Sequence, residues 1–228
     1  MQPNKSDKDK DNRPKKPTYT TLTCFAVKEE AEPYEQHPRK HSSVEILITG
    51  MGAKNAEESL RKSIAIHRPL LVLSCGFAGG LNPYLDRGTV IFSGGDARLE
   101  SRMLAAGAVH GHIGNVEHVI TKAAEKQKLF ESLKVDAVDM ESEALAKVCT
   151  EEKIQFAIVR VIMDAANEDL PVDFNELMTP ELTINRFKLA TMLVKAPKNI
   201  FVLKKFRKER IEPAAEALTK LLVNVLPV

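Results

Sequence analysis

The sequence predicts an α/β fold in which a mixed, mostly parallel sheet is flanked by helices. Apolar segments typical of buried strands alternate with segments of helical periodicity, and residues 43–76 form a complete strand–helix–strand unit. The chain has 228 residues, 43% of them hydrophobic, which suits one substantial domain. We expect that domain at residues 18–228, after a disordered basic leader at residues 1–17 that lacks apolar periodicity.

The first half of the chain predicts three strands, each rich in apolar or β-branched residues. They lie at residues 19–27 (YTTLTCFAV), 43–50 (SVEILITG) and 69–76 (PLLVLSCG). Between the first two strands, residues 28–36 (KEEAEPYEQ) predict an acidic turn or a short helix that stops near its proline. Residues 53–67 predict a helix, because apolar and small residues recur there at helical spacing.

The second half continues the alternation. Further strands are predicted at residues 89–95, 135–140 and 155–164. Further helices are predicted at residues 122–133, 141–152, 180–193 and 209–225. In sheets of this kind ligands bind outside the carboxyl ends of the strands, so chemistry is expected in the loops that follow them.

Composition and charge argue against several classes of protein. Residues 1–17 carry a net +3 and residues 195–212 a net +5, which leaves −6 for the rest of a chain with +2 overall. A mildly acidic body with two basic segments is unlike a nucleic-acid-binding protein, so no nucleic-acid partner is expected. There is no secretory signal or membrane-spanning apolar run, and the three cysteines are scattered in apolar sequence, so we expect a cytoplasmic protein with buried thiols.

Two glycine-rich loops follow successive strands of the strand–helix–strand unit. The first, ITGMGAKNA, contains Gly50 and Gly52, and the second, SCGFAGGLNP, contains Gly76, Gly79 and Gly80. Glycines there let the backbone approach a ligand and leave helix N-terminal amides free, although a tight turn explains the first loop as well. The spacing matches neither a Walker loop nor a dinucleotide-binding fingerprint.

An acidic residue lies on the apolar side of the helix predicted in VDAVDMESEALAKVC. Glu141 lies four residues before Leu145 and seven before Val148, whereas Glu143 is placed to pair with Lys147. Complementation of the helix dipole is an alternative explanation for Glu141.

Two other places carry charges that chemistry could use. In VRVIMDAA, Arg160 and Asp164 interrupt a buried strand and its exit, so Arg160 needs a carboxylate or a ligand as partner. A structural ion pair would satisfy it equally. Glu29 and Glu30 follow the first strand, where a solvated turn is the default expectation.

Together these motifs resemble the nucleoside phosphorylase and nucleosidase superfamily, particularly its methylthioadenosine/S-adenosylhomocysteine nucleosidase-like and hopanoid-associated phosphorylase-like branches. The resemblance covers about residues 22–195 and rests on VDMESEALA, SCGFAGGLNP and VRVIMDAANEDLPVDF, with TGMGAKNA in support. It implies a three-layer α/β/α fold, a homo-oligomer that is a dimer or larger, and cleavage of the N-glycosidic bond of a purine (adenosine-type) nucleoside. No metal or cofactor is expected, apart from phosphate as co-substrate if the reaction is phosphorolytic.

The resemblance also implies roles for individual residues. Glu141 matches the glutamate that accepts hydrogen bonds from the ribose hydroxyls, and Met140 the residue beneath the sugar. Asp164 matches the general acid toward N7 of the base, Glu30 the carboxylate that activates water, and Arg160 an arginine near the nucleophile. The other residues expected to bind substrate are Gly50, Gly52, Phe77, Ala78, Gly79, His118 and Met163.

Some positions depart from the family pattern. Phe77 and Met163 stand where typical nucleosidases have serines, and His118 replaces a purine-stacking phenylalanine, which leaves the substrate open. Leu71 stands where hexameric purine phosphorylases have a phosphate-binding arginine. An anion without a cation is costly in a closed site, so water is the expected nucleophile. Phosphorolysis, or a non-catalytic nucleoside-binding or membrane-adaptor protein, remains an alternative.

The C-terminal region is expected to be a basic helical extension at about residues 195–228. Its sequence resembles the ending of hopanoid-associated members of the superfamily. Weak contact of residues 195–212 with an anionic membrane, as a peripheral protein, is one interpretation, and a solvated helix face is the other. The cations that would face the membrane are Lys204, Lys205, Arg207 and Lys208.

Overall fold

The computed structural model describes residues 20–183 and 185–227, so the predicted leader at residues 1–17 lies outside the described residues. Within them, eight strands form one sheet with the order β2-β1-β3-β8-β4-β5, while β7 pairs with β3 and β6 pairs with β7. The strands are β1 (Thr21–Phe25), β2 (Val44–Ile48), β3 (Leu71–Gly80), β4 (Val90–Gly94), β5 (Val109–His110), β6 (Ile113–Asn115), β7 (Ala137–Asp139) and β8 (Gln155–Asp164).

The sheet is mixed and mostly parallel, as the sequence predicts. Strands β2, β1, β3 and β8 run parallel, β4 is antiparallel to β8, and β7 is antiparallel to the end of β3. The pairing of β3 with β8 shifts between Ala78 and Gly79, so that Gly79 lies opposite Asp164. This irregularity lies at the carboxyl ends of the two central strands.

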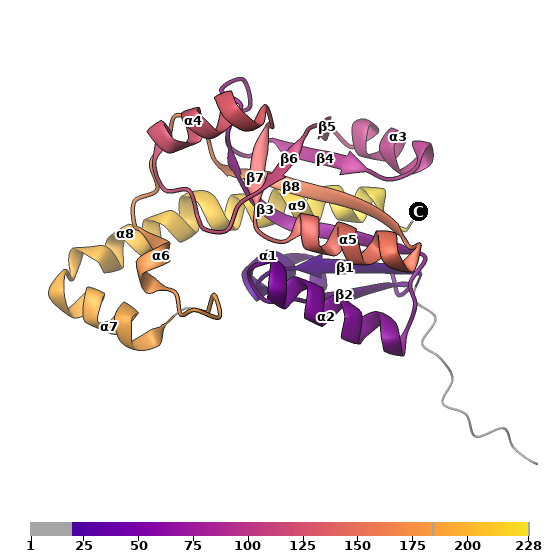
Figure 1. Cartoon of the computed structure of the whole chain (residues 1–228), viewed down its shortest axis with the longest axis horizontal. Helices are drawn as coiled ribbons and strands as arrows, with labels where there is room; N and C mark the ends of the chain where they lie inside the picture. Colours follow the sequence, from indigo (N-terminus) through magenta and orange to yellow (C-terminus); the bar gives the residue numbers. More distant parts are fainter. Residues whose placement is uncertain (1–19, 184, 228) are drawn as a thin grey trace, which may run out of the picture.

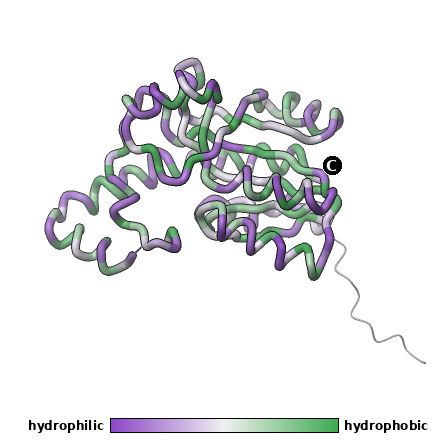
Figure 2. The backbone as a smooth tube through the Cα atoms, viewed as in Figure 1, coloured by the Kyte–Doolittle hydropathy of each residue, from purple (hydrophilic) through white to green (hydrophobic). Residues whose placement is uncertain are grey.

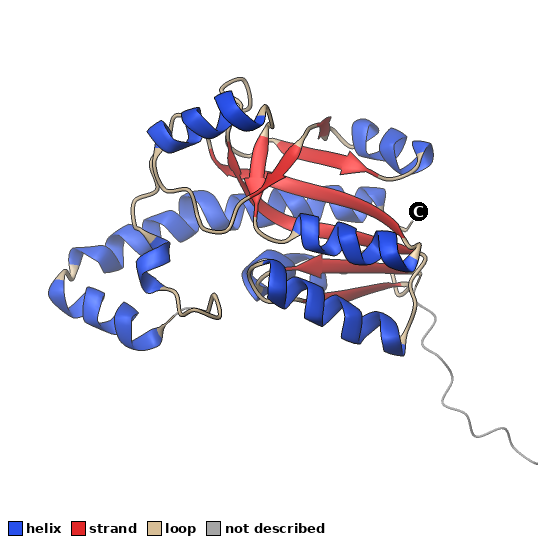
Figure 3. Ribbon diagram, in the orientation of Figure 1, coloured by secondary structure: helices blue, strands red, loops and turns tan. Residues whose placement is uncertain are grey.

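Helices cover both faces of the sheet and give the three-layer α/β/α arrangement (Figures 1 and 3). Helices α2 and α5 pack together on one face, and α1, α3 and α9 cover the other. The helices are α1 (Lys28–Glu35), α2 (Ala53–Ile66), α3 (Ala97–Ala105), α4 (Ala123–Leu133), α5 (Ser142–Glu152), α6 (Phe174–Leu177), α7 (Arg186–Lys195), α8 (Lys198–Phe206) and α9 (Glu212–Val225), with a π-helical turn η1 (Arg207–Ile211) between the last two.

Two apolar cores hold these layers together. Under α2 and α5, Leu60 and Leu145 pack on Val72 of β3, and all three side chains are at most 1% exposed. On the other face, Leu218 and Leu222 of α9 join a larger cluster against β3 and β8. Cys24, Cys75 and Cys149 are buried free thiols within these cores.

The observed elements differ from the prediction in three places. Helix α1 continues through Pro33 to Glu35. Helices α3 and α6 and the short strands β5 and β6 were not predicted. The apolar spacing of α3 is present in the sequence, with Leu99 and Met103 four residues apart, whereas α6, β5 and β6 have four residues or fewer. The helix predicted at residues 180–193 begins at Arg186, and the basic segment that follows forms α8.

Helices α7 and α8 form a hairpin that extends away from the sheet (Figure 1) and alternates hydrophilic and hydrophobic residues (Figure 2). In the part of the chain that the structure describes, none of the helices has the length and apolar character needed to span a bilayer.

Candidate functional site

A pocket of about 200 Å³ opens at the carboxyl ends of β1, β3 and β8, beside the start of α5. It brings together most of the residues that the sequence predicts for the site. The predicted residues that line it are Glu30, Phe77, Ala78, Gly79, His118, Met140, Glu141, Met163 and Asp164.

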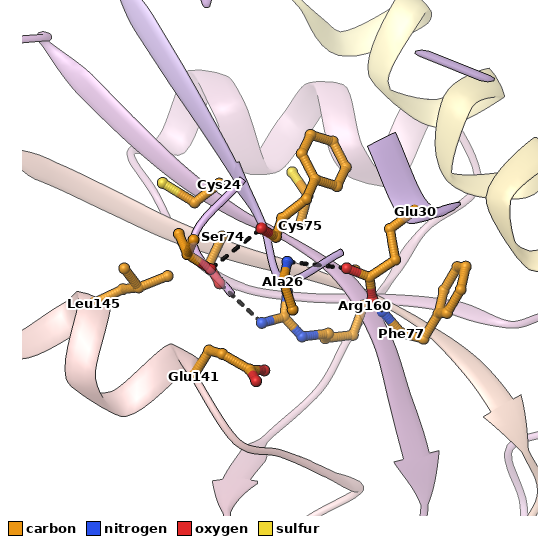
Figure 4. A pocket seen from close by; sticks show the side chains of 12 residues that line it. Cys24, Ala26, Glu30, Ser74, Cys75, Phe77, Glu141, Leu145 and Arg160 are labelled. Atoms are coloured by element: carbon orange, nitrogen blue, oxygen red, sulfur yellow. Dashed lines mark hydrogen bonds between the residues drawn. The ribbon is translucent and has the colours of Figure 1, made fainter. Parts of the chain in front are cut away.

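Three predicted residues lie outside the lining of this pocket. Arg160 lies deeper, where it lines a separate cavity of about 10 Å³ together with Glu30 and Glu141 (Figure 4). Gly50 and Gly52 line neither space, although Gly52 contacts the site through Glu141. A direct contact between the two glycines and a substrate therefore stays a prediction.

Glu30 is held beneath the pocket by backbone amides. Its Oε2 accepts hydrogen bonds from the N–H groups of Ala26 (3.0 Å) and Val27 (3.3 Å), and its Oε1 accepts one from Phe77 (2.9 Å). Burial raises the pKa of the Glu30 carboxyl above its usual value, while these amides and Arg160 oppose the rise. The expectation of a solvated turn is wrong for both residues, because they lie in the first turn of helix α1. Exposure to solvent holds for Glu29 but not for Glu30.

A glycine makes room for this carboxylate. Gly76 has φ +154°, and a Cβ atom there would lie 2.7 Å from Oε1 of Glu30. Gly76, the first glycine in SCGFAGG, is thus required by the close approach of Glu30 to the backbone of β3.

Glu141 occupies the N-cap position of α5 and is 9% exposed. Its Oε1 accepts a 2.6 Å hydrogen bond from the backbone N–H of Gly52, at the start of α2. Burial and the neighbouring Asp139 raise the pKa of Glu141 to about 7, against the opposing effects of Gly52 N–H and Arg160. This carboxylate therefore changes charge close to neutral pH.

Arg160 is buried and tied into a polar network. Its Nη2 lies 2.6 Å from Oδ2 of Asp139 and 2.8 Å from the hydroxyls of both Ser74 and Ser142, and its Nη1 donates to the carbonyl of Val159. The sequence called for a carboxylate or a ligand beside Arg160, and Asp139 is that carboxylate. Across residues 20–183 and 185–227, Nε of Arg160 has no hydrogen-bond partner.

Asp139 also holds the start of α5. Its Oδ1 accepts hydrogen bonds from the backbone N–H groups of Glu141 (3.3 Å) and Ser142 (3.1 Å). This carboxylate thereby fixes the backbone from which Glu141 projects, much as a capping side chain does. Within the VDMES motif, Asp139 thus ends β7 and holds the start of α5, and Glu141 lines the pocket.

Asp164 ends β8, lines the pocket and is 2% exposed. Its Oδ2 forms a buried ion pair with Nζ of Lys126, from α4. Burial raises the pKa of the Asp164 carboxyl above its usual value, and the charges of Lys126 and Arg210 oppose the rise.

The rest of the lining is largely apolar. Met140, Met163 and Phe77 lie on its walls, together with valine and isoleucine side chains from residues 116–120 and 138. His118 has 58% of its side chain exposed and pairs with Glu125 at 3.3 Å, so it lies at the rim. Among the described lining residues of this pocket none is a lysine or an arginine.

Sequence reasoning missed three charged or polar residues of the site: Lys126, Asp139 and Ser142. The signal for Lys126 was present, because it precedes Leu129 and Phe130 by three and four residues and so lies on the apolar side of its helix. Asp139 and Ser142 flank Glu141 in the chain, but their contact with Arg160 depends on strand order and could not be read from spacing.

Comparison with known proteins points to one family. The profile of the phosphorylase superfamily matches residues 95–195. The 5′-methylthioadenosine/S-adenosylhomocysteine nucleosidase of Staphylococcus epidermidis is 23% identical over 172 residues, covering 60% of this chain and 75% of the relative. The nucleosidase of the same name from Staphylococcus carnosus is 26% identical over 172 residues, with the same coverage of both chains.

Solved structures share the fold. The 5′-methylthioadenosine/S-adenosylhomocysteine nucleosidase of Neisseria meningitidis, in complex with methylthio-immucillin-A, superposes with a TM-score of 0.65 at 16% identity, covering 91% of this chain and 98% of that one. Futalosine hydrolase of Helicobacter pylori gives a TM-score of 0.63 at 14% identity, covering 90% of this chain and 97% of that one.

Proposed function

We propose that the chain belongs to the phosphorylase superfamily, whose profile matches residues 95–195, and that it hydrolyses the N-glycosidic bond of a purine nucleoside. The observation that carries this proposal is that three buried carboxylates, Glu30, Glu141 and Asp164, meet at one pocket from three different elements. Cleavage of a ribosyl–purine bond needs a group that binds the sugar, a base for the nucleophile and an acid for the leaving group. The names of the relatives support the same class of reaction.

We assign sugar binding to Glu141. The N–H of Gly52 holds Oε1, so the carboxylate has a fixed position from which it can accept hydrogen bonds from the 2′- and 3′-hydroxyls. Met140 lines the same wall and offers an apolar surface for the ribose. A carboxylate beside the sugar also favours the positive charge that develops on the ring as the bond breaks.

We assign activation of water to Glu30. The cavity of about 10 Å³ between Glu30, Glu141 and Arg160 has the size of one water molecule. The Nε–H of Arg160, which has no hydrogen-bond partner among the described residues, is a donor available to that water. Three amide hydrogen bonds orient the Glu30 carboxylate, which would remove a proton as the water oxygen attacks the anomeric carbon.

Asp164 is the proposed general acid. Its burial favours the protonated form, which an acid acting near neutral pH requires. The Asp164 proton passes to N7 of the purine while the electrons of the glycosidic bond move to the base. The base then leaves as a neutral molecule.

Water is favoured over phosphate as the nucleophile. Arg160 is already paired with Asp139, and Leu71 is a buried core residue at the start of β3. A phosphate dianion near Arg160 would have to approach Glu30 and Glu141, two carboxylates that line the same cavity. Bringing like charges together in a buried site is strongly unfavourable.

One assay tests the proposal. Methylthioadenosine, S-adenosylhomocysteine, adenosine and inosine are incubated with the protein, with and without phosphate, and the sugar product is identified. We expect free ribose or its 5′-substituted form at the same rate in both buffers. Ribose 1-phosphate would establish phosphorolysis instead, and binding without release of base would indicate a nucleoside-binding protein without catalysis.

We also propose that residues 195–212 contact an anionic membrane weakly. Within this range Phe201 is 76% exposed, and Phe187 and Val194 of the adjoining helix α7 are 81% and 80% exposed. Exposed aromatic and aliphatic side chains interleaved with cations are typical of segments that lie on anionic bilayers. The exposed cations within residues 195–212 are Lys195, Lys198, Lys204, Lys205, Arg207 and Lys208, and Lys188 of α7 is exposed beside them.

Sedimentation with vesicles tests the membrane proposal. Binding is expected to vesicles that contain phosphatidylglycerol, to weaken at high salt, and to be lost when Phe187 and Phe201 are both changed to serine. Equal sedimentation with phosphatidylcholine vesicles, or none at low salt, would refute it. The resemblance also leads us to propose a homo-oligomer, which light scattering should detect as a mass at least twice that of the chain.

A further inference from the structure

A wholly buried lysine lies beside the proposed general acid. The side chain of Lys126 is 0% exposed, and its Nζ contacts Oδ2 of Asp164. The same nitrogen donates 2.8 Å hydrogen bonds to the carbonyls of Ala165 and Glu168. Buried lysines are rare unless they are paired, and here all three hydrogens of the ammonium group have acceptors.

The surrounding structure fixes the ammonium group in place. Helix α4 carries Lys126 on its apolar side, next to Leu129 and Phe130. At the start of the helix, Oδ1 of Asp169 accepts the N–H of Ala123, which ties the loop after β8 to α4. Lys126 thus links the helix to Asp164 and to the loop that follows it.

We propose that Lys126 is a positioning residue for the general acid, holding Oδ2 of Asp164 so that the transferable proton resides on Oδ1. This inference rests on the proposed role of Asp164. A carboxylic acid can carry its proton on either oxygen, and the oxygen that carries the proton is the weaker hydrogen-bond acceptor. The contact of the Lys126 ammonium with Oδ2 therefore favours the proton on Oδ1.

The same contact helps the acid after it has reacted. When the Oδ1 proton moves to the purine, Asp164 becomes an anion in a buried site, where an unpaired charge is costly. The Lys126 ammonium is already in place and needs no rearrangement to stabilise that anion. Lys126 should therefore make Asp164 a stronger acid than burial alone would allow.

Other charges also face Asp164 and belong to any account of its pH dependence. Arg210 of η1 lowers the pKa of Asp164, and Glu168 of the loop after β8 raises it. Arg210 and Glu168 also pair with each other at 3.2 Å. Arg87 also binds Glu168 at 3.1 Å. Across the pocket the remaining titratable lining residues are Glu30, His118, Asp139 and Glu141. These groups are unchanged by a substitution at Lys126.

The test is Lys126→Met, which keeps the length and apolar character of the buried stem. Lys128→Met, an exposed position on the same helix, is the matched control. We expect a fall in kcat of about 10- to 100-fold for Lys126→Met, and an upward shift of about one pH unit in the alkaline limb of kcat/KM. The limb moves upward because Asp164 without its cation loses its proton at higher pH.

Carbon-13 NMR of labelled aspartate carboxyls gives a readout that needs no turnover. The titration of the Asp164 signal, assigned with Asp164→Asn, should move upward in Lys126→Met and in Lys126→Gln and stay unchanged in Lys128→Met. An unmoved Asp164 titration in folded variants would overturn the inference. Wild-type protein that releases no base would defeat the proposed reaction, yet the NMR titration would still decide whether Lys126 acts on Asp164.

Discussion

The backbone N–H of Gly52 donates a 2.6 Å hydrogen bond to Oε1 of Glu141, joining the start of α2 to the start of α5. The two residues are 89 positions apart in the chain. The contact explains why Gly52 matters to the site even though neither glycine of the first loop lines the pocket. Its amide fixes the carboxylate that we assign to the sugar.

Glu141→Gln should abolish most of the activity. Glutamine has one acceptor oxygen instead of two, so it cannot keep the bond from Gly52 N–H and also accept from both ribose hydroxyls, and it carries no charge to favour the developing sugar cation. We expect kcat/KM for methylthioadenosine to fall about 100-fold or more. The wild-type acid limb near pH 7, set by Glu141, should disappear in the variant. Glu143→Gln, an exposed neighbour, is the control and should resemble the wild type.

The same substitution should stabilise the protein at alkaline pH. The pKa of Glu141 is about 7 in the folded state against an ordinary value of 4.5, so its stabilising protonated form is lost as pH rises through 7. Above pH 7 the buried anion then costs on the order of 3 kcal/mol, which glutamine avoids. Calorimetry should give Glu141→Gln a Tm roughly 5–10 °C above the wild type at pH 8 and little difference at pH 4.5. Parallel Tm curves for the two proteins would contradict this assignment.

Glu30→Gln should slow the attack of water. The N–H groups of Ala26 and Phe77 donate to different oxygens of Glu30. Glutamine has only one acceptor oxygen, so it cannot satisfy both in the same way, and it cannot take a proton from water. We expect kcat to fall by about 100- to 10,000-fold with little change in fold. Glu29→Gln alters the exposed residue next to it and should leave kcat within twofold of the wild type. Similar losses in both variants would argue against a specific role for Glu30.

Gly76→Ala should displace the Glu30 side chain while leaving its carboxyl group unaltered. The added Cβ would lie 2.7 Å from Oε1 of Glu30, at a φ of +154°. We expect a loss of stability of about 1–3 kcal/mol by chemical denaturation, with a loss of kcat comparable to that of Glu30→Gln. Gly88→Ala is the control, because Gly88 also has positive φ (+89°) but has nothing within 4 Å of an added Cβ. If both variants lost the same activity, backbone strain alone would explain the effect.

Much of the fold followed from periodicity, and part of the site did not. The central strands β3 and β8 were predictable because buried parallel strands read as continuous apolar runs. Periodicity also separated Glu141 from Glu143. It could not separate Glu30 from Glu29, because the burial of Glu30 depends on the approach of β3 near Gly76, a contact across 46 positions that no local pattern encodes.

The partners of the charged residues were the least predictable feature. Arg160 needed a carboxylate, but only the pairing of β3 with β7 and β8 brings Asp139 to it. The position of Lys126 on the apolar side of its helix indicates that the lysine is buried. It does not indicate that Asp164 is its partner. Local sequence thus indicated which charges were unusual, and sheet topology decided how they pair.

The most direct test of glycosidic hydrolysis with Asp164 as the acid compares two leaving groups in phosphate-free buffer. Adenine must be protonated to leave methylthioadenosine, whereas 4-nitrophenolate leaves its riboside without a proton. We predict that Asp164→Asn loses at least about 100-fold in kcat on the nucleoside and less than about threefold on the nitrophenyl riboside. Equal losses on both substrates, or no release of adenine by the wild type, would contradict the proposed reaction.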